Sequence, residues 1–154
     1  MHRTYENGDI VVFWDSEKCF HAKKCVGGCP EVFNIQRKPW IDLSRAPSME
    51  IWKAIDKCPS GALSCVYSHE IRVELDSENL RSVAMDKDRQ IGECDYEETP
   101  EGRVIYHTEV IPEYEGRGIA KRLVYKILEA SEREGKKVIP TCSYAVKLLG
   151  SNKG

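Results

Sequence analysis

Hydrophobic and polar positions follow different patterns on the two sides of residue 68. Before it, apolar runs predict strands over 10–14 and 62–67, and a short apolar stripe predicts a helix over 47–58. After it, apolar and charged residues alternate from Ile71 to Asp76, which is typical of a strand with one buried face. This change predicts that the architecture differs between the two parts of the chain.

The pattern beyond Asp76 predicts further strands and the longest helix. Strands are expected at 80–85, 90–97, 103–111 and 138–140, with turns at 86–88 and 100–102. Helices are expected at 117–134 and 143–149, the first with apolar residues at four-residue intervals and a stop at Gly135. Together these elements predict an α+β fold.

Composition and charge narrow the class of protein. The chain has 154 residues, of which 41% are hydrophobic and 31% charged, and its net charge is −2. These values exclude a disordered chain, and without a basic stripe nucleic acid is not expected as a partner. No apolar run approaches the ~20 residues that cross a bilayer, so we expect no membrane partner and a cytoplasmic location. Two short domains are predicted, 1–68 and 69–154.

Seven cysteines are many for this length, and five of them fall within the first 65 residues. Four have the arrangement of a metal site: Cys19, Cys25, Cys29 and Cys58. Four thiolates complete the coordination of an iron–sulfur cluster or of a tetrahedral zinc ion. Structural zinc favours close cysteine pairs, and here only Cys25-x3-Cys29 has that spacing, while buried structural thiols are a third interpretation. Cys65 lies on a predicted strand and is expected to pack in the core.

The residues around these cysteines carry a family resemblance. It rests on the segments Cys19-Phe20-His21-Ala22-Lys23-Lys24-Cys25, Cys29-Pro30-Glu31-Val32-Phe33 and Cys58-Pro59-Ser60-Gly61-Ala62-Leu63. Over about residues 5–67 the chain resembles the divergent single-cluster 4Fe–4S family. The resemblance implies a small ferredoxin-like domain with a 4Fe–4S cluster held by the four cysteines. Family members often have an apolar residue at the position of Cys29, so His21 is either a ligand or a hydrogen-bond partner.

A glycine-rich turn precedes the longest predicted helix, at Gly116-Arg117-Gly118-Ile119-Ala120. Backbone N–H groups at a helix start have no intrahelical acceptor, so such a turn binds phosphate. A tight strand-to-helix connection without a ligand is the alternative. No Gly-Lys-Ser/Thr follows, and no acidic residue lies at the distance expected for a dinucleotide site, so neither a P-loop nor a Rossmann site is indicated.

The stretch from His107 to Val124, with Ile139-Pro140-Thr141-Cys142-Ser143-Tyr144, resembles the short GCN5-related N-acetyltransferases that have a cysteine after their fifth strand. The resemblance implies a compact GNAT-like mixed α/β domain in which loop amides hold the pyrophosphate of acetyl-CoA and a splayed strand binds its pantetheine arm. These roles fall on Gly116, Arg117, Gly118, Ile119, Ala120 and Lys121 in the loop, and on Glu109, Val110 and Ile111 in the strand. Glu115 stands where the superfamily usually has Arg or Gln, so one phosphate-directed side chain is missing.

Four residues of the second region are candidates for chemistry. Cys142 follows a strand and precedes a short helix, whose N-terminus favours a thiolate, and Tyr144 is a candidate proton donor to the leaving CoA thiolate. His107 or Glu109 is a candidate general base for an acceptor amine. The alternative for Cys142 and Tyr144 is a packing role. The alternative for His107 and Glu109 is exposure to solvent. Cys94, on a predicted strand, is expected to pack.

Two hypotheses from different classes follow. The first is an acyltransferase that passes the acetyl group of acetyl-CoA to an amine, directly or through a thioester on Cys142. The second is a non-enzymatic electron carrier or redox sensor with a CoA-binding or docking domain. In either case the expected partners are acetyl-CoA and a redox partner protein. The cluster would sense redox state, accept electrons or hold its domain together.

Overall fold

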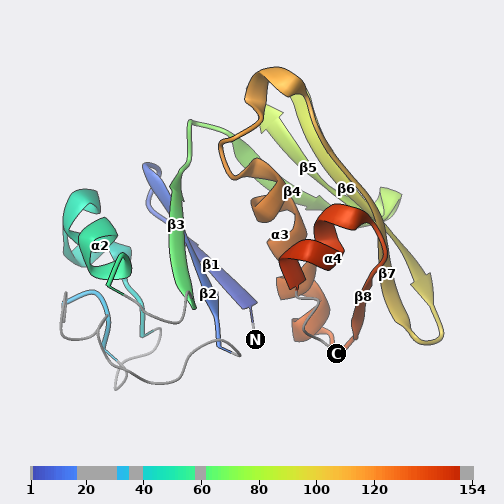
Figure 1. The fold of residues 1–154 in the computed structure, drawn as a ribbon, viewed down its shortest axis with the longest axis horizontal. Helices are drawn as coiled ribbons and strands as arrows, with labels where there is room; N and C mark the ends of the chain where they lie inside the picture. Colours follow the sequence, from blue (N-terminus) through green and yellow to red (C-terminus); the bar gives the residue numbers. More distant parts are fainter. Residues whose placement is uncertain (1, 17–30, 35–39, 58–61, 150–154) are drawn as a thin grey trace. The chain divides into compact units, whose positions relative to one another are not determined.

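The computed structural model describes residues 2–16, 31–34, 40–57 and 62–149. Contacts within the chain divide it into two compact units, Met1–His69 and Glu70–Gly154 (Figure 1). Each unit has its own sheet, and each is therefore described separately. Among the described residues, no helix combines the length and the apolar character needed to cross a membrane.

The first unit contains a three-stranded antiparallel sheet in the order β1-β2-β3. Its elements are β1 (His2–Glu6), β2 (Ile10–Asp15), a 3-10 turn (Leu43–Arg45), α2 (Ser48–Ile55) and β3 (Leu63–Tyr67). The strands predicted at 10–14 and 62–67 and the helix that begins at Ser48 are confirmed. The pattern did not indicate β1, because this edge strand is mostly polar and only half-buried.

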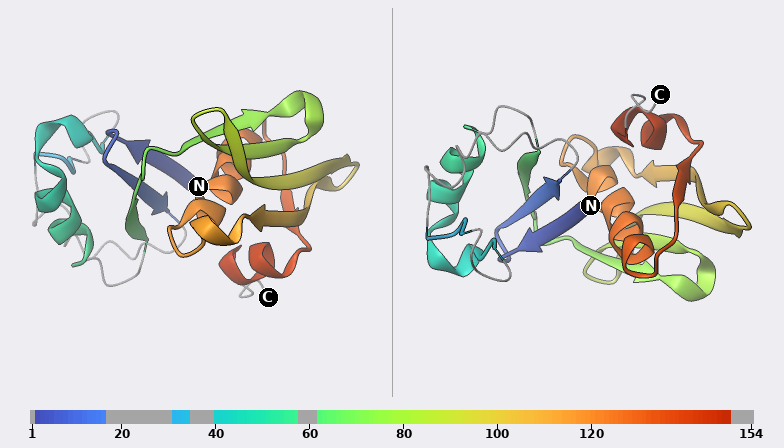
Figure 2. Two further views of the ribbon diagram at one scale, coloured as in Figure 1. Left: turned by 90° about the horizontal axis from the view of Figure 1, so that it is seen from above. Right: turned by 90° about the horizontal axis from the view of Figure 1, so that it is seen from below.

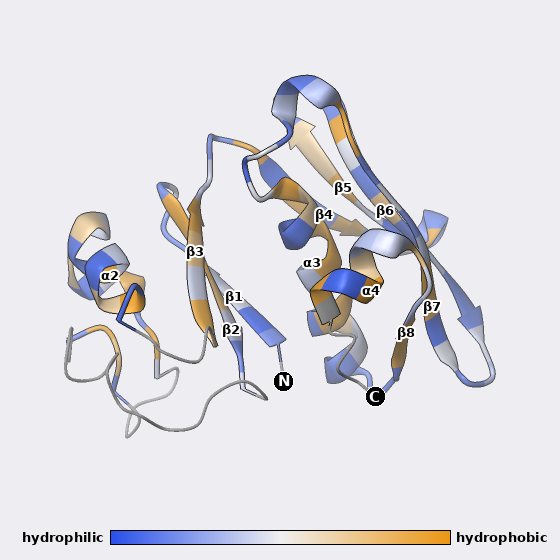
Figure 3. Cartoon of the chain, viewed as in Figure 1, coloured by the Kyte–Doolittle hydropathy of each residue, from blue (hydrophilic) through white to orange (hydrophobic). Residues whose placement is uncertain are grey.

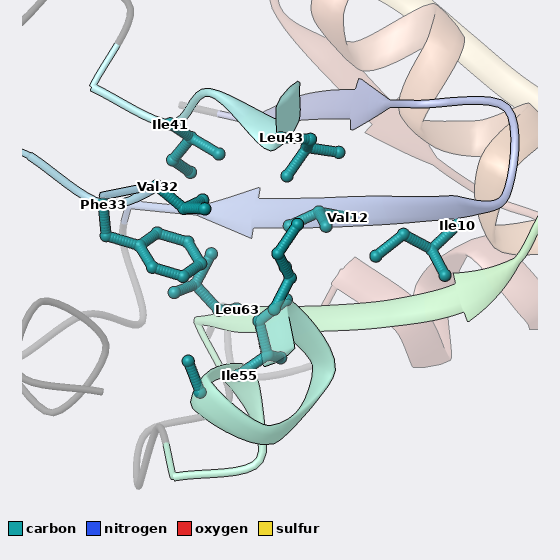
Figure 4. Close-up of a cluster of buried hydrophobic side chains, with 10 residues drawn as sticks. Ile10, Val12, Val32, Phe33, Ile41, Leu43, Ile55 and Leu63 are labelled. Carbon is teal, nitrogen blue, oxygen red and sulfur yellow. The ribbon is translucent and has the colours of Figure 1, made fainter. Parts of the chain in front are cut away.

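The core of the first unit lies between the sheet and α2. Figure 4 shows side chains from the strands, the helix and the intervening loops gathered into one cluster. Its buried members are Ile10, Val12, Val32, Phe33, Ile41, Leu43, Ile51, Ala54, Ile55 and Leu63. Trp14 and Trp40 pack against this cluster with their ring centroids 5.0 Å apart. Cys65 packs against it from β3, as expected.

The second unit contains a five-stranded sheet in the order β4-β5-β6-β7-β8. The strands are β4 (Arg72–Asp76), β5 (Arg81–Asp86), β6 (Arg89–Thr99), β7 (Gly102–Val110) and β8 (Val138–Pro140). The helices are α3 (Ile119–Arg133) and α4 (Ser143–Leu149), with 3-10 turns at Ser77–Asn79 and Pro112–Tyr114. The first four strands run antiparallel in succession, whereas β8 pairs with β7 in parallel. Every strand and helix predicted for this part is confirmed.

Helix α3 covers one face of this sheet (Figure 2). The helix carries both hydrophobic and hydrophilic stretches (Figure 3), and Ile119, Leu123 and Ile127 on its apolar face are almost fully buried. Ser82 Oγ on β5 donates to the Leu123 carbonyl over 2.8 Å. The helix ends before Gly135, whose φ of +70° is the left-handed conformation that glycine adopts readily. These contacts hold the start of α3 against the centre of the sheet.

A buried arginine fixes the other end of α3. Arg103, on β7, donates to Ser131 Oγ over 3.0 Å and to a Glu134 carboxylate oxygen over 2.6 Å. Its Nε also donates to Glu98 on β6 over 3.1 Å. Because the guanidinium is 6% exposed and lies between carboxylates, its charge is compensated where water is scarce.

Shortening Leu123 should destabilise the second unit strongly. Leu123 is fully buried, so Leu123→Ala leaves a cavity, and we expect a loss of about 2–5 kcal/mol in the free energy of unfolding. Urea unfolding followed by far-ultraviolet circular dichroism measures it. The matched control is Leu80→Ala, because Leu80 is 37% exposed, and it should cost less than ~1 kcal/mol. Equal losses in the two variants would contradict the packing described here.

Candidate functional site

A cavity of about 390 Å³ opens between β7, α3 and α4 in the second unit. It is lined by residues of the strand, of the turn before α3, of the first turn of α3 and of α4. They are Thr108, Val110, Tyr114, Glu115, Gly116, Gly118, Ile119, Ala120 and Tyr144. The cavity thus joins the glycine-rich turn to the segment that follows β8.

The cavity exists because β8 is shorter than its partner. The parallel pairing ends at Ile105 opposite Pro140, while β7 continues to Val110. Proline has no N–H to extend the ladder. Alternate residues of a strand turn their backbone groups to opposite edges, and the Ile111 N–H donates to Ile91 on β6 over 2.9 Å. By the same alternation, Val110 presents its backbone N–H and C=O to the edge that β8 has left.

The glycine-rich turn brings the start of α3 to this cavity. Gly116 and Gly118 have φ of +81° and +77°, which residues with a Cβ seldom adopt. Gly118 is the N-cap of α3 and has no side chain to accept a hydrogen bond from the first-turn N–H groups. Those N–H groups and the positive end of the helix dipole favour an anion at this end of the cavity.

The segment that leads into the glycine-rich turn is anchored to the hairpin of β5 and β6. The Tyr114 hydroxyl donates to the Asp86 carboxylate, and this hydrogen bond raises the pKa of Tyr114. The Arg117 guanidinium lies over the Tyr114 ring, 5.1 Å from its centroid, and the Lys121 ammonium lies 5.7 Å from the Tyr125 ring. Arg117 and Lys121 add positive charge beside the helix start, whereas the carboxylate of Glu115 lines the cavity and opposes it.

Two cysteines meet one threonine at the other end. Thr108 Oγ1 lies 3.4 Å from Cys94 Sγ on β6 and 3.4 Å from Cys142 Sγ. The Ala145 N–H donates to Cys142 Sγ over 3.3 Å, so the Cys142 sulfur accepts a hydrogen bond in the first turn of α4. Burial raises the pKa of Cys94 to about 12, which keeps it a neutral thiol. Cys94 is fully buried, as expected, and its sulfur contacts the same Thr108 hydroxyl as the sulfur of Cys142.

Tyr144 lines the cavity from α4, two residues beyond Cys142. Burial, with smaller effects from the two cysteines, raises the pKa of Tyr144. Its phenol therefore remains protonated at neutral pH, and a protonated phenol donates hydrogen bonds. The structure thus brings two of the predicted catalytic residues, Cys142 and Tyr144, to the same side of β7.

The other two predicted catalytic residues lie on the opposite face of β7. A bulge pairs Asp95 with His107 but Tyr96 with Ile105, which leaves Tyr106 as an extra residue in β7. Beyond it, Thr108 and Val110 face the cavity, so His107 and Glu109 face away from it. His107 Nε2 lies 3.1 Å from a Glu109 carboxylate oxygen.

Two acidic residues that the sequence analysis missed lie beside His107. Glu93, Asp95 and His107 each bring one ligand-type atom within 4.8 Å of the others, on the outer face of β6 and β7. Partial burial and the neighbouring Glu93 raise the pKa of Asp95 to about 6. The alternation of Glu93 and Asp95 with buried Cys94 and Tyr96 was the available sequence signal for a shared face.

In the first unit, the predicted metal ligands Cys19, Cys25, Cys29 and Cys58, and also His21, lie outside the described residues. The described residues that flank them come together. The Asp15 N–H, at the end of β2, donates to the Ala62 carbonyl over 2.8 Å, four residues from Cys19 and from Cys58 respectively. Val32 and Ile55, each three residues from a predicted ligand, are buried in the same core cluster. These contacts bring together the described flanks of three of the predicted ligands, Cys19, Cys29 and Cys58.

Comparison with known families gives the same division of the chain. Residues 5–68 match the family model described as "Divergent 4Fe-4S mono-cluster", and residues 81–153 match "GCN5-related N-acetyl-transferase". The chain thus joins a region that matches the divergent 4Fe-4S family to a region that matches the GCN5-related N-acetyltransferases. The predicted α+β fold, ferredoxin-like first and GNAT-like second, is confirmed.

The first part of the chain also has curated relatives. It is 39% identical over 69 residues to "Uncharacterized protein YjdI" of Escherichia coli strain K12, a match that covers 45% of this chain and 88% of the relative. The protein of the same name from E. coli O157:H7 matches equally. The first unit therefore belongs to the same family as YjdI.

Two solved structures resemble the chain. One is a GCN5-related N-acetyltransferase from Sphaerobacter thermophilus, 19% identical, with a TM-score of 0.37 over 90% of this chain. This chain covers 34% of that protein's length. The other is the aminoglycoside acetyltransferase HMB0005 from an uncultured soil metagenomic sample, 16% identical, with a TM-score of 0.39 over 95% of this chain and 92% of that one.

Removing one predicted cluster ligand should release the iron. In Cys58→Ala the four-thiolate set is incomplete, and we expect the purified protein to lose its iron, its acid-labile sulfide and its broad visible absorption. The matched control is Cys65→Ala, because Cys65 packs against the core from β3 and should leave the iron content unchanged. A Cys58→Ala protein that keeps a full complement of iron would exclude Cys58 as a required ligand.

Proposed function

We propose that the second unit binds acetyl-CoA and transfers its acetyl group to an amine. The observation that carries the proposal is the cavity beside β7, with an anion-favouring helix start at one end and a hydrogen-bonded cysteine near the other. An acyl-CoA needs both, because its pyrophosphate is an anion and its reactive thioester lies at the far end of a long arm. Membership of the acetyltransferase family supports the same substrate.

Binding would use the two ends of the cavity differently. The amides of the turn from Gly116 to Lys121 would hold the pyrophosphate, helped by the positive charges of Arg117 and Lys121. The pantetheine arm would lie along the free edge of β7 and hydrogen-bond the backbone of Val110. Ile111 is less suited to this role than the sequence suggests, because its N–H already donates to Ile91.

The chemistry we propose is thioester exchange followed by aminolysis. The Cys142 thiolate attacks the acetyl carbonyl, a new carbon–sulfur bond forms, and the bond to the CoA sulfur breaks. The departing CoA thiolate takes the phenolic proton of Tyr144, which its surroundings keep protonated. An amine then attacks the acetyl group on Cys142, forms an amide and returns the thiolate. The proton that the amine loses restores the phenol of Tyr144, so the residues end as they began.

Direct transfer to the amine is the alternative route within the same function. It would use His107 as general base, oriented by Glu109 through their 3.1 Å contact. Both side chains lie on the outer face of β7, so this route requires the amine to approach the carbonyl from that face. The two routes differ in whether an acetyl group ever resides on the protein.

The first unit has a separate role in the proposal. Cys19, Cys25, Cys29 and Cys58 would hold the cluster, with His21 beside it. A bound 4Fe–4S cluster supplies one-electron transfer and also cross-links its domain. Exchange of an electron with a redox partner protein is the function that this family membership supports.

Changing a glycine of the turn should weaken acetyl-CoA binding. Gly116 lines the cavity and, apart from its chain neighbours, no protein atom lies within 4 Å of a Cβ placed on it. A methyl group there would occupy space proposed for the pyrophosphate. Gly116→Ala should therefore raise the dissociation constant for acetyl-CoA about tenfold, measured by isothermal titration calorimetry. The control is Gly135→Ala at the other end of α3, which has a similar φ and equally open surroundings. If both variants bind like the parent chain, the turn does not hold the pyrophosphate.

Removing the thiol should separate the two chemical routes. Incubation of the parent chain with acetyl-CoA should leave one acetyl group on Cys142, detected by intact-protein mass spectrometry and removed by hydroxylamine. Cys142→Ala should lack this adduct and lose at least ~100-fold in transfer to an amine. Cys65→Ala should behave like the parent chain. Full turnover in Cys142→Ala together with loss of turnover in His107→Gln would establish the direct route instead.

A further inference from the structure

We propose that Tyr114 is a positioning residue for the phosphate end of acetyl-CoA. Its hydroxyl fixes the glycine-rich turn through Asp86, and its ring holds the Arg117 guanidinium beside the cavity. The inference rests on the proposed binding of acetyl-CoA to this cavity, and it names the side chains that prepare the site for the phosphates. Tyr114 and Asp86 are not among the site residues that the sequence predicted.

The glycine-rich turn needs an anchor because its own backbone provides little restraint. Gly116 and Gly118 have φ of +81° and +77°, and glycine loses more conformational freedom on ordering than any other residue. Packing does not restrain Gly116 since, apart from its chain neighbours, no protein atom lies within 4 Å of a Cβ placed on it. A turn that becomes ordered only when the ligand binds loses affinity, because the ordering cost is subtracted from the interaction energy. Contacts that flank the turn therefore decide how well its amides are prearranged.

Tyr114 supplies the anchor on the N-terminal side of the turn. It ends the 3-10 turn Pro112–Tyr114, two residues before Gly116, and its hydroxyl donates to the Asp86 carboxylate at the end of β5. This hydrogen bond raises the pKa of Tyr114, so the phenol remains a donor at neutral pH. A charged acceptor makes such a bond roughly twice as strong as one between neutral groups. The bond thus ties the turn to a distant part of the sheet.

The hairpin that receives this bond is itself held in place. Arg72 on β4 donates to the Lys87 carbonyl at the tip of the hairpin over 3.0 Å. Arg89, just beyond the tip, contacts Glu113 over 3.4 Å, but both of these side chains are more than half exposed, so the ion pair adds little. The bond from the Tyr114 hydroxyl is therefore the stronger of the two side-chain links between the turn and the hairpin.

The ring of Tyr114 has a second role. It lines the cavity, and the Arg117 guanidinium lies over it, 5.1 Å from the ring centroid. A guanidinium held against an aromatic face loses fewer side-chain conformations when it binds a phosphate. Glu115 brings a carboxylate to the same cavity, where it repels an anionic ligand. The charge of Arg117 beside the cavity wall offsets that repulsion and compensates for the phosphate-directed side chain that position 115 lacks.

A purely structural anchor is the competing explanation. Such an anchor would stabilise the second unit without distinguishing one ligand from another. The arrangement described here acts on the phosphates alone, because the turn lies at the helix-start end of the cavity, whereas Cys142 contacts Thr108 at the other end. The two explanations therefore differ in what they predict for a ligand that has the thioester but no phosphate.

The test compares acetyl-CoA with S-acetylpantetheine, which has the same thioester and arm but no phosphate, in the full chain. Tyr114→Phe keeps the ring and removes the hydroxyl, so the dissociation constant for acetyl-CoA, from isothermal titration calorimetry, should rise about tenfold. Tyr114→Leu also removes the ring and should raise it further. The dissociation constant for S-acetylpantetheine, from ligand-observed nuclear magnetic resonance, should not change in either variant. The matched control is Tyr106→Phe, because Tyr106 is 51% exposed on β7 and lies outside the cavity lining.

Changes at Asp86 show whether Tyr114 acts through it. Asp86→Ala should weaken acetyl-CoA binding about as much as Tyr114→Phe, and the double variant should bind no more weakly than either single variant. Asp86→Asn keeps an acceptor oxygen and should lie closer to the parent chain. Circular dichroism checks that each variant is folded.

The outcomes separate this inference from the proposed function. Unchanged acetyl-CoA affinity in folded Tyr114→Phe overturns the inference, as does an equal loss of affinity for the two ligands. In both cases the proposed binding stands, because the parent chain binds acetyl-CoA. A parent chain that binds no acetyl-CoA refutes the proposed function and this inference with it. A parent chain that binds acetyl-CoA but transfers no acetyl group refutes only the transfer.

Discussion

In the second unit, the turn from β8 into α4 is held by one carbonyl oxygen. Ile105 O, on β7, accepts hydrogen bonds from the N–H groups of Thr141 and Cys142, over 2.9 and 3.2 Å, and from the Thr141 hydroxyl over 3.0 Å. These bonds lie directly after Pro140, where the parallel ladder ends. They turn the chain out of β8 and into α4. The same point therefore ends a strand, opens the edge of β7 and brings Cys142 to Thr108.

Periodicity predicted the strands and helices but not which strand faces meet the cavity. Arg103 and Ile105 are buried, so simple alternation along β7 would turn His107 and Glu109 inward as well. The bulge at Tyr106 reverses the phase and turns Thr108 and Val110 inward instead. A bulge leaves no reliable mark in a single sequence, because it depends on how the neighbouring strand pairs. That is why Thr108 escaped notice although its neighbours were candidates.

The first unit shows a different limit of sequence reasoning. Cysteine spacing indicated an iron–sulfur cluster or a zinc ion, since ligand chemistry demands particular residue types, and the resemblance of the surrounding segments then favoured the 4Fe–4S family. Spacing alone does not say what brings distant segments together. In the structure this depends on the Asp15 to Ala62 hydrogen bond and on a shared core that includes Val32 and Ile55. Those contacts involve ordinary backbone and aliphatic groups, which carry no distinctive signal.

The packing of Trp14 against Trp40 has an optical consequence. The chain has three tryptophans, and the third, Trp52, belongs to α2, so all of them lie in the first unit. Indole emission from this chain thus reports on its first unit alone. The acetyltransferase part contributes tyrosine light without an indole. Tyr5 and Tyr67 lie in the first unit, so tyrosine emission comes from both units, whereas indole emission distinguishes the first unit without a dye.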